Sequence, residues 1–358
     1  MLRGEAIGSW YKVNQMHHLR GRLAAIAICI AALASAQSQP QTAKDFLKKY
    51  LGFTDAEIAE LDKGALVTKL PKVTDDSEVA AFAAVRVNAP AERLASQFRD
   101  IVRWKKGESV PEIGKFSEKP QLSDLADLSI EPADIKLLKK CKPGSCDIKL
   151  SAASMDRLVK GTNWQADNYQ GQAENLFKEM LIDYVGTYRT GGNRNLVNYA
   201  DQKQVLKLPE EFSALLKESN YVTEYAPELA NYIDKFPNAQ LPGSDEFVYW
   251  SKEKFGIQPV VSATHVTIYP RRRGNSNEVL IASKQLYATH YFESSLAFTM
   301  MIPRDGGDGS YLLYLNRSRS DTLRGFLSGI TRLFISGRVR DGAAKSLQLA
   351  KERLEAGQ

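Results

Sequence analysis

Apolar residues recur at two different spacings along this chain. Between Thr42 and Pro242 most of them lie three or four positions apart, which predicts amphipathic helices, and after Gly243 they lie two apart, which predicts β-strands. One earlier segment, Glu78–Val87, also alternates, with valine and alanine side chains on one face. The pattern therefore predicts an early strand, a largely helical middle and a block of strands toward the C-terminus.

The predicted helices have recognisable ends. Thr42 and Thr54 each precede a short stretch of helical periodicity, and their hydroxyls can accept hydrogen bonds from first-turn amides. A longer helix is predicted over residues 163–189, and Gly191-Gly192 ends it. Residues 323–354 return to helical spacing and predict a long C-terminal helix.

The strands of the C-terminal block are joined by short loops. Glycine-containing loops at residues 271–275 and 305–309 separate neighbouring strands, which is typical of hairpins and predicts an antiparallel sheet. The predicted strands cover residues 247–252, 260–269, 279–287, 289–302 and 311–318.

Composition narrows the class of protein. With 358 residues, 43% of them hydrophobic and 25% charged, the chain is neither collagen-like nor disordered nor a small disulfide-rich scaffold. The net charge of +6 is partly a feature of the N-terminus, because residues 1–36 hold four basic residues and one acidic residue. The remainder carries +3 and is nearly balanced, so we expect no nucleic-acid partner.

The N-terminus has the layout of a secretory signal peptide. A basic segment ending at Arg22 is followed by the apolar run Leu23 to Leu33 and by the small residues Ala34-Ser35-Ala36. The apolar run has 11 residues, roughly half of the ~20 that a spanning helix needs. We therefore predict cleavage after Ala36, with Met16 as an alternative start, and delivery to the periplasm or the extracellular space.

Two cysteines remain after such cleavage. Cys141 and Cys146 flank Pro143-Gly144, a pair that favours a tight turn, and an even number of thiols in an exported chain favours a disulfide. Closing this loop is worth about 2 kcal/mol in the chain-entropy model. The alternatives are free thiols, or a redox or metal site, although the spacing is not C-x-x-C.

Catalytic motifs are absent from the sequence. It contains no G-x-S-x-G, P-loop, G-x-G-x-x-G or H-E-x-x-H segment, and it predicts no metal ion and no cofactor. His290 shares its predicted strand face with Leu296 and Phe298, so we expect it to point into the apolar interior. The alternative is a histidine that contacts a ligand or acts as an acid or base.

Arginine is enriched toward the C-terminus. Its guanidinium bonds two oxygens at once, which suits phosphate and carboxylate groups, and in an exported protein the anionic partner would be a lipid headgroup. The alternative is a solvated helix face. The candidates for an anionic membrane surface are Arg317, Arg324, Arg332 and Arg338.

Segments at the two ends of the predicted domain carry a family resemblance. They are the strand that runs into Asn88-Ala89-Pro90-Ala91-Glu92, the strand over 289–302, and the helix ending Lys351-Glu352-Arg353-Leu354. Their order resembles the START and polyketide-cyclase-like superfamily. The resemblance implies an α+β fold in which a curved antiparallel sheet grips the long C-terminal helix and leaves a cavity for a lipid or another apolar molecule.

On this basis the chain is divided into a signal peptide (1–36), a helical lead-in (37–77) and a helix-grip-like domain (78–356) interrupted by a helical insertion (151–244). The expected function is that of an exported binding protein for a lipid or other hydrophobic small molecule. The alternatives are a cyclase- or hydrolase-like enzyme using His290, and a structural or envelope-interaction protein with a filled core. The predicted cavity residues are His290, Phe292, Leu296, Phe298, Met300, Phe326, Ile330 and Phe334.

Overall fold

A computed structural model describes residues 42–255, 258–306, 308–324 and 328–356, with backbone only for residue 255 and residues 328–334. The predicted signal peptide and Phe326 lie outside the described residues, as do the side chains of Ile330, Arg332 and Phe334. The description below therefore concerns the chain from Thr42 onward.

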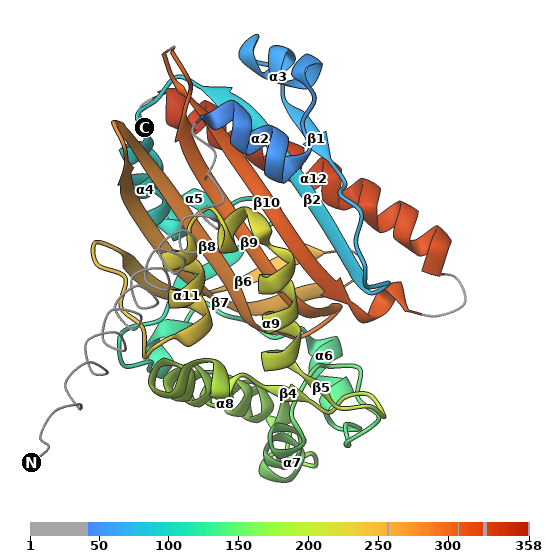
Figure 1. Ribbon diagram of the computed structural model, residues 1–358. Helices are drawn as coiled ribbons and strands as arrows, with labels where there is room; N and C mark the ends of the chain where they lie inside the picture. The colour runs from blue at the N-terminus through green and yellow to red at the C-terminus, as the bar shows by residue number, and fades with distance from the viewer. Residues whose placement is uncertain (1–41, 256–257, 307, 325–327, 357–358) are drawn as a thin grey trace, which may run out of the picture. The chain divides into compact units, whose positions relative to one another are not determined.

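An open antiparallel sheet of eight strands forms the centre of this part of the chain (Figure 1). The strand order is β1-β2-β10-β9-β8-β7-β6-β3, so the early strand β2 lies beside the last strand β10. Together with the helices on both faces, the sheet confirms the predicted α+β class and the gripped C-terminal helix. The strands are β1 (Val67–Lys69), β2 (Glu78–Val87), β3 (Glu112–Lys115), β6 (Asp245–Phe255), β7 (Gln258–Arg273), β8 (Ser276–Ala288), β9 (Phe292–Pro303) and β10 (Ser310–Ser320), with a separate pair β4 (Asn198–Tyr199) and β5 (Leu206–Lys207).

Helices precede the sheet, interrupt it and close the chain. They are α2 (Ala43–Leu51), α3 (Asp55–Asp62), α4 (Ala91–Arg99), α5 (Ile101–Lys105), α6 (Pro132–Leu138), α7 (Ala152–Gly161), α8 (Tyr169–Gly191), α9 (Leu208–Glu218), α10 (Asn220–Thr223), α11 (Pro227–Lys235) and α12 (Ser328–Ala356), with 3-10 turns η1 (Leu122–Leu125), η2 (Gly192–Asn195) and η3 (Asp321–Leu323).

Helix ends follow the capping residues in the sequence. The Thr42 hydroxyl accepts a hydrogen bond from the Asp45 amide at 3.0 Å, and Thr54 forms a capping box with Glu57. Helix α8 stops at the predicted glycine pair, because Gly192 has φ +60° and a Cβ there would collide with the Phe236 carbonyl. These local signals explain why the helical boundaries were readable from the sequence.

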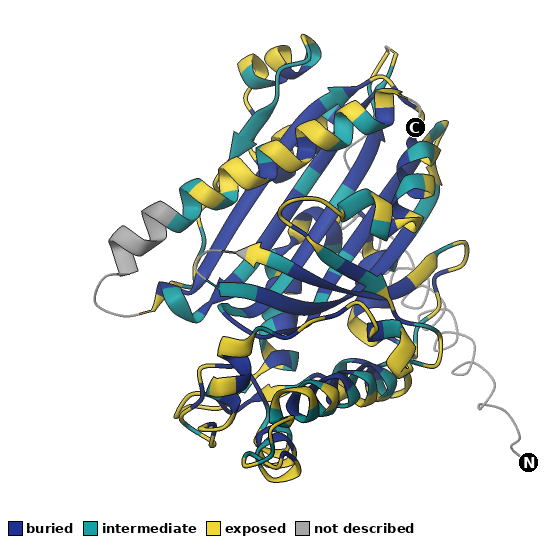
Figure 2. Ribbon diagram, turned by 180° about the vertical axis from the view of Figure 1, so that it is seen from behind, coloured by how far each residue is buried: buried dark blue, intermediate teal, exposed yellow. Residues whose placement is uncertain are grey.

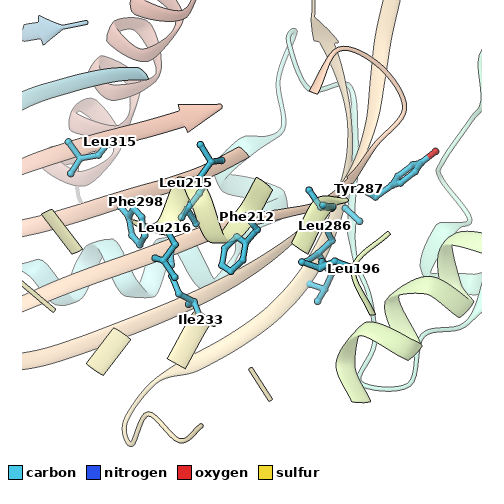
Figure 3. Close-up of a cluster of buried hydrophobic side chains, with 14 of the residues drawn as sticks. Leu196, Phe212, Leu215, Leu216, Ile233, Leu286, Tyr287, Phe298 and Leu315 are labelled. Carbon is cyan, nitrogen blue, oxygen red and sulfur yellow. The ribbon is translucent and has the colours of Figure 1, made fainter. Parts of the chain in front are cut away.

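One face of the sheet is covered by the insertion. Phe298 of β9 is fully buried and packs edge-on against Tyr221 of α10, with ring centroids 5.7 Å apart. Figure 3 shows Phe212 and Leu215 of α9 in the same cluster of apolar side chains as Phe298. We call this side the insertion face. It is a continuous apolar core.

The opposite face is covered by α4 and α12, and we call it the helix-grip face. The longest helix, α12, packs along β2 and β10 (Figure 2). Its Ala343 and Leu347 belong to one apolar cluster with Leu312 and Met301 of the sheet. Every inner strand thus contributes alternate residues to two separate cores.

The predicted relation between β9 and the last helix is wrong for the described side chains. Leu296, Phe298 and Met300 were expected to face α12, but they lie on the insertion face, and Met301 lies on the helix-grip face instead. Both faces of β9 are apolar at its end, so alternation alone did not show which face met which helix. The predicted assignment of the two faces of β9 is therefore inverted, and its more apolar face packs against the insertion.

Buried ion pairs connect the sheet to the insertion. Arg317 of β10 pairs with Glu78 of β2, and Arg319 reaches Glu211 of α9 at 2.8 Å. Arg317 has a relative exposure of 7%, so it does not belong to an anionic-surface site, contrary to the prediction. Its guanidinium is instead buried and paired with Glu78, because a buried charge without a partner would lower the stability of the fold.

The loop between α6 and α7 holds the predicted disulfide. Cys141 and Cys146 are bonded with an S–S distance of 2.03 Å, which confirms the pairing expected from the sequence. Among the described residues, no helix is both long and apolar enough to cross a bilayer.

The inverted assignment of β9 leads to a stability test. Phe298→Ala should lower the free energy of unfolding by ~3–5 kcal/mol, because it leaves a cavity in a filled core. Thr299→Ala, one residue along on the half-exposed opposite side, should cost less than about 1 kcal/mol. Urea denaturation of both variants measures this difference. Equal losses would contradict the assignment of the two faces.

Candidate functional site

Half of the helix-grip face is polar. Tyr314 of β10 lies opposite Thr299 of β9, which lies opposite Ile281 of the apolar helix-grip cluster, so all three share this face. Moving along the strands from Tyr314, alternate positions are hydroxyl or amide residues. We call this set, together with Lys105 from α5, the polar face: Lys105, Tyr249, Ser251, Glu253, Ser262, Thr264, Ser283, Gln285, Ser295, Thr299, Tyr314, Asn316 and Ser318.

Part of the polar face is incompletely buried, although Ser251, Ser262, Thr264 and Asn316 are buried. Ser283, Thr299 and Tyr314 lie on three adjacent inner strands, and each is only half-buried. Their immediate neighbours on the insertion face, such as Ala282 and Phe298, are at most 1% exposed. The same inner strands are therefore closed on one side and partly open on the other.

A fixed ion pair lies at one side of the polar face. The Lys105 ammonium is 3.0 Å from the Glu253 carboxylate and 3.1 Å from the Tyr249 hydroxyl. Ser251 donates a hydrogen bond to the same carboxylate at 2.8 Å. Burial alone would raise the pKa of Glu253, but the charge of Lys105 outweighs burial, and the pKa of Glu253 is lowered overall. Burial alone would lower the pKa of Lys105, but Glu253 and Tyr249 outweigh burial, and the pKa of Lys105 is raised overall. Both groups stay charged at neutral pH.

Tyr314 extends this charged environment across the sheet. Burial raises the pKa of its hydroxyl to about 12, so the group keeps its proton and can donate a hydrogen bond. The charges of Lys105 and Glu253 both act on this hydroxyl. The polar face therefore presents donors and acceptors in fixed positions beside a neutralised ion pair. It lacks the features of a nucleophilic site, because Ser251 is fully buried and Glu253 is held ionised as a weak base.

The sequence contained a signal for this face that the hydrophobic pattern obscured. Tyr314, Asn316 and Ser318 alternate with Leu315 and Arg317 along β10. Such alternation is usually read as a solvent-facing side of a sheet. Lys105 had no signal at all, because only the fold brings the end of α5 to Glu253.

A second polar cluster lies on the insertion face, where α8 meets the sheet. The ammonium nitrogen of Lys284, on β8, is 3.0 Å from the Tyr188 hydroxyl, which is 2.9 Å from Nδ1 of His265. His265 Nε2 is 3.4 Å from the Glu246 carboxylate, which is the last group in this row of contacting side chains. Lys284 also contacts Asn193 and lies over the Phe212 ring at 4.2 Å.

Burial fixes the protonation of this cluster. It lowers the pKa of Lys284 far below the usual range, and it lowers the pKa of His265 despite the nearby Glu246. When His265 is neutral, its proton lies on Nε2 and is donated to the Glu246 carboxylate. Nδ1 then accepts a hydrogen bond from the Tyr188 hydroxyl, and the tyrosine oxygen accepts one from Lys284. Lys284 is only 2% exposed, so we interpret the cluster as a structural contact between the insertion and the sheet rather than a site that a ligand could reach.

The other predicted site residues are placed as follows. His290 lies in the turn before β9, not on a strand, and both ring nitrogens are used: Nδ1 is 3.1 Å from the Asp147 carbonyl and Nε2 is 3.2 Å from Asp134. Phe292 is half-buried at the start of β9. Arg324 pairs with Glu293 at 2.9 Å, and Arg338 is exposed on α12. The structure does not bring these residues together into one site.

Within the described part of the chain, no set of three histidine, cysteine or acidic side chains is arranged to hold a metal ion. A shallow surface pocket of about 470 Å³ lies at the start of α4, between Asn88, Asn277 and Asp308.

Comparison with protein-family models, curated proteins and solved structures finds no significant match.

The buried lysine makes stability depend on pH in a defined direction. The pKa of Lys284 is lower in the folded chain than the ordinary value of 10.5, so folding releases a proton below that pH and stability rises as the pH approaches it. Relative to Lys284→Met, the wild type should gain up to ~1.4 kcal/mol per pH unit as the pH rises from the lowered folded-state pKa toward the ordinary value of 10.5. Denaturation curves across this range measure the difference.

The control is Gln285→Met, one residue along β8, which introduces no change in ionisable groups and should run parallel to the wild type. Parallel curves for wild type and Lys284→Met would show that Lys284 is charged in the folded chain.

Proposed function

We propose that the protein binds a small amphipathic molecule, such as a lipid, whose polar groups contact the polar face. The proposal rests on Ser283, Thr299 and Tyr314, three hydroxyl-bearing residues in the middle of a large sheet that are only partly buried. Sheet positions that face packed protein are usually apolar, as they are on the insertion face. Hydroxyls in this place indicate a face that meets water or a polar ligand group.

The ion pair supplies a way to orient such a ligand. Lys105 and Glu253 keep each other charged, so a ligand can bond to either of them without taking a bare charge out of water. Tyr249 and Tyr314 add hydroxyl groups with rigid rings. The apolar part of the ligand would extend toward the last helix, and Phe326, Ile330 and Phe334 stay a prediction for that contact.

Export is part of the same proposal. A disulfide between Cys141 and Cys146 favours an oxidising compartment, in agreement with the signal-like N-terminus. The sheet that grips α12 supports the resemblance to the START and polyketide-cyclase-like superfamily, whose members hold apolar ligands between these two elements. Binding outside the cytoplasm follows from these features taken together.

Neither alternative function gains support from a specific contact. An enzyme using His290 would need a free ring nitrogen, and both are hydrogen-bonded in a buried position. A purely structural role fits the insertion face, which is filled, but it gives no reason for the partly buried hydroxyl-bearing residues on the other side.

Native mass spectrometry of the purified protein tests the proposal. The wild type should carry a small molecule, and Thr299→Trp should reduce its recovery by about tenfold or more because the indole occupies the polar face. The variant should unfold within about 1 kcal/mol of the wild type, since Thr299 is half-exposed.

Thr299→Ser is the matched control, because it keeps the hydroxyl without adding volume and should retain most of the bound molecule. Recovery of the same molecule from the tryptophan variant, or of none from the wild type, would rule out binding at this face.

A further inference from the structure

Exposed lysines gather at the end of α6 and around the disulfide loop. Lys136, Lys139 and Lys140 follow one another at helical spacing, so they share one side of this turn, and Lys142 lies inside the loop closed by the disulfide. All four side chains are exposed.

Lys203 joins the same group from a distant part of the sequence. The Gly144 amide donates to the Ala200 carbonyl at 2.8 Å, and the Cys146 amide donates to the Asp201 carbonyl at 3.0 Å. The Lys203 Cα is 3.7 Å from the position that a Cβ on Gly144 would take. We call Lys136, Lys139, Lys140, Lys142 and Lys203 the basic patch. In Figure 1 its elements, α6 and the β4–β5 connection, lie side by side.

The acidic residues of these segments are turned inward. Asp134 contacts His290, Glu131 pairs with Lys252 at 2.6 Å, and Asp201 lies 3.6 Å from Lys149. No lysine of the basic patch forms an ion pair with a described residue. Asp147 is exposed at the end of the loop, which leaves the lysines in clear excess.

Apolar side chains are exposed among these charges. Val205, two residues from Lys203, has a relative exposure of 51%, and Pro143 is exposed at the tip of the disulfide loop. A nucleic acid or another soluble polyanion gains nothing from such apolar contacts. A membrane surface uses both kinds of group, since lysines meet headgroup phosphates and apolar side chains enter the interface.

We propose that the basic patch docks the protein on a membrane surface that contains anionic lipids. The disulfide and the two backbone hydrogen bonds fix the loop that carries Lys142 beside Lys203, so little conformational entropy is lost on binding. The lysines contact lipid phosphates while Val205 and Pro143 contact the acyl boundary. The basic patch is distinct from the arginine candidates, of which Arg317 is buried.

Vesicle co-sedimentation tests the proposal. The full chain is expressed, and the protein is purified in the form that the cells produce. The wild type should bind phosphatidylglycerol-containing vesicles, bind phosphatidylcholine vesicles weakly, and dissociate as salt rises. Substituting Lys139→Glu, Lys140→Glu and Lys142→Glu together should weaken binding roughly 100-fold. The matched control, Lys63→Glu with Lys160→Glu and Lys207→Glu, makes the same charge change at exposed lysines elsewhere and should bind nearly as the wild type does.

Val205→Asn separates lipid from other polyanions. It should weaken binding to anionic vesicles and leave retention on heparin unchanged. The proposal is overturned if both triple variants lose binding equally, if neutral vesicles bind as well as anionic ones, or if Val205→Asn leaves vesicle binding intact. Thermal unfolding of each variant shows whether the fold is kept, and it does so independently of any ligand on the polar face.

Discussion

Side chains alternate along a strand, so each inner strand of this sheet must serve two environments at once. Strand β9 illustrates the constraint, because Phe298 enters the insertion core while Thr299 faces the other way. The insertion packs against the large apolar residues on that side and adds buried ion pairs such as Glu211 with Arg319. With that face closed, the proposed binding depends on the helix-grip face, where Ser283, Thr299 and Tyr314 are only partly buried.

Charge is handled differently on the two faces. On the insertion face, charges are either paired, as Arg319 is with Glu211, or disfavoured by burial, which lowers the pKa of Lys284. Both arrangements suit a packed interior, in which an unpaired charge would be costly. On the polar face, Lys105 and Glu253 keep their charges and stay partly accessible. This difference separates a structural joint from a surface that can recognise a ligand.

Local signals in the sequence predicted much of the fold. The bounds of β2, the caps at Thr42 and Thr54 and the disulfide agree with the structure because each depends on neighbouring residues. Sequence reasoning failed where distant segments choose partners. Leu296 was assigned to the wrong face, since both sides of β9 carry apolar residues and alternation alone does not show which side meets the insertion. His290 was placed on a strand because no local signal marked the turn that holds it beside Asp134.

An experimental structure of the protein purified without denaturation tests the central claim most directly. The account predicts non-protein electron density against Thr299 and Tyr314, within hydrogen-bonding distance of Lys105 or Glu253. Side chains of the chain itself filling this face, with ligand and water both excluded, would contradict it.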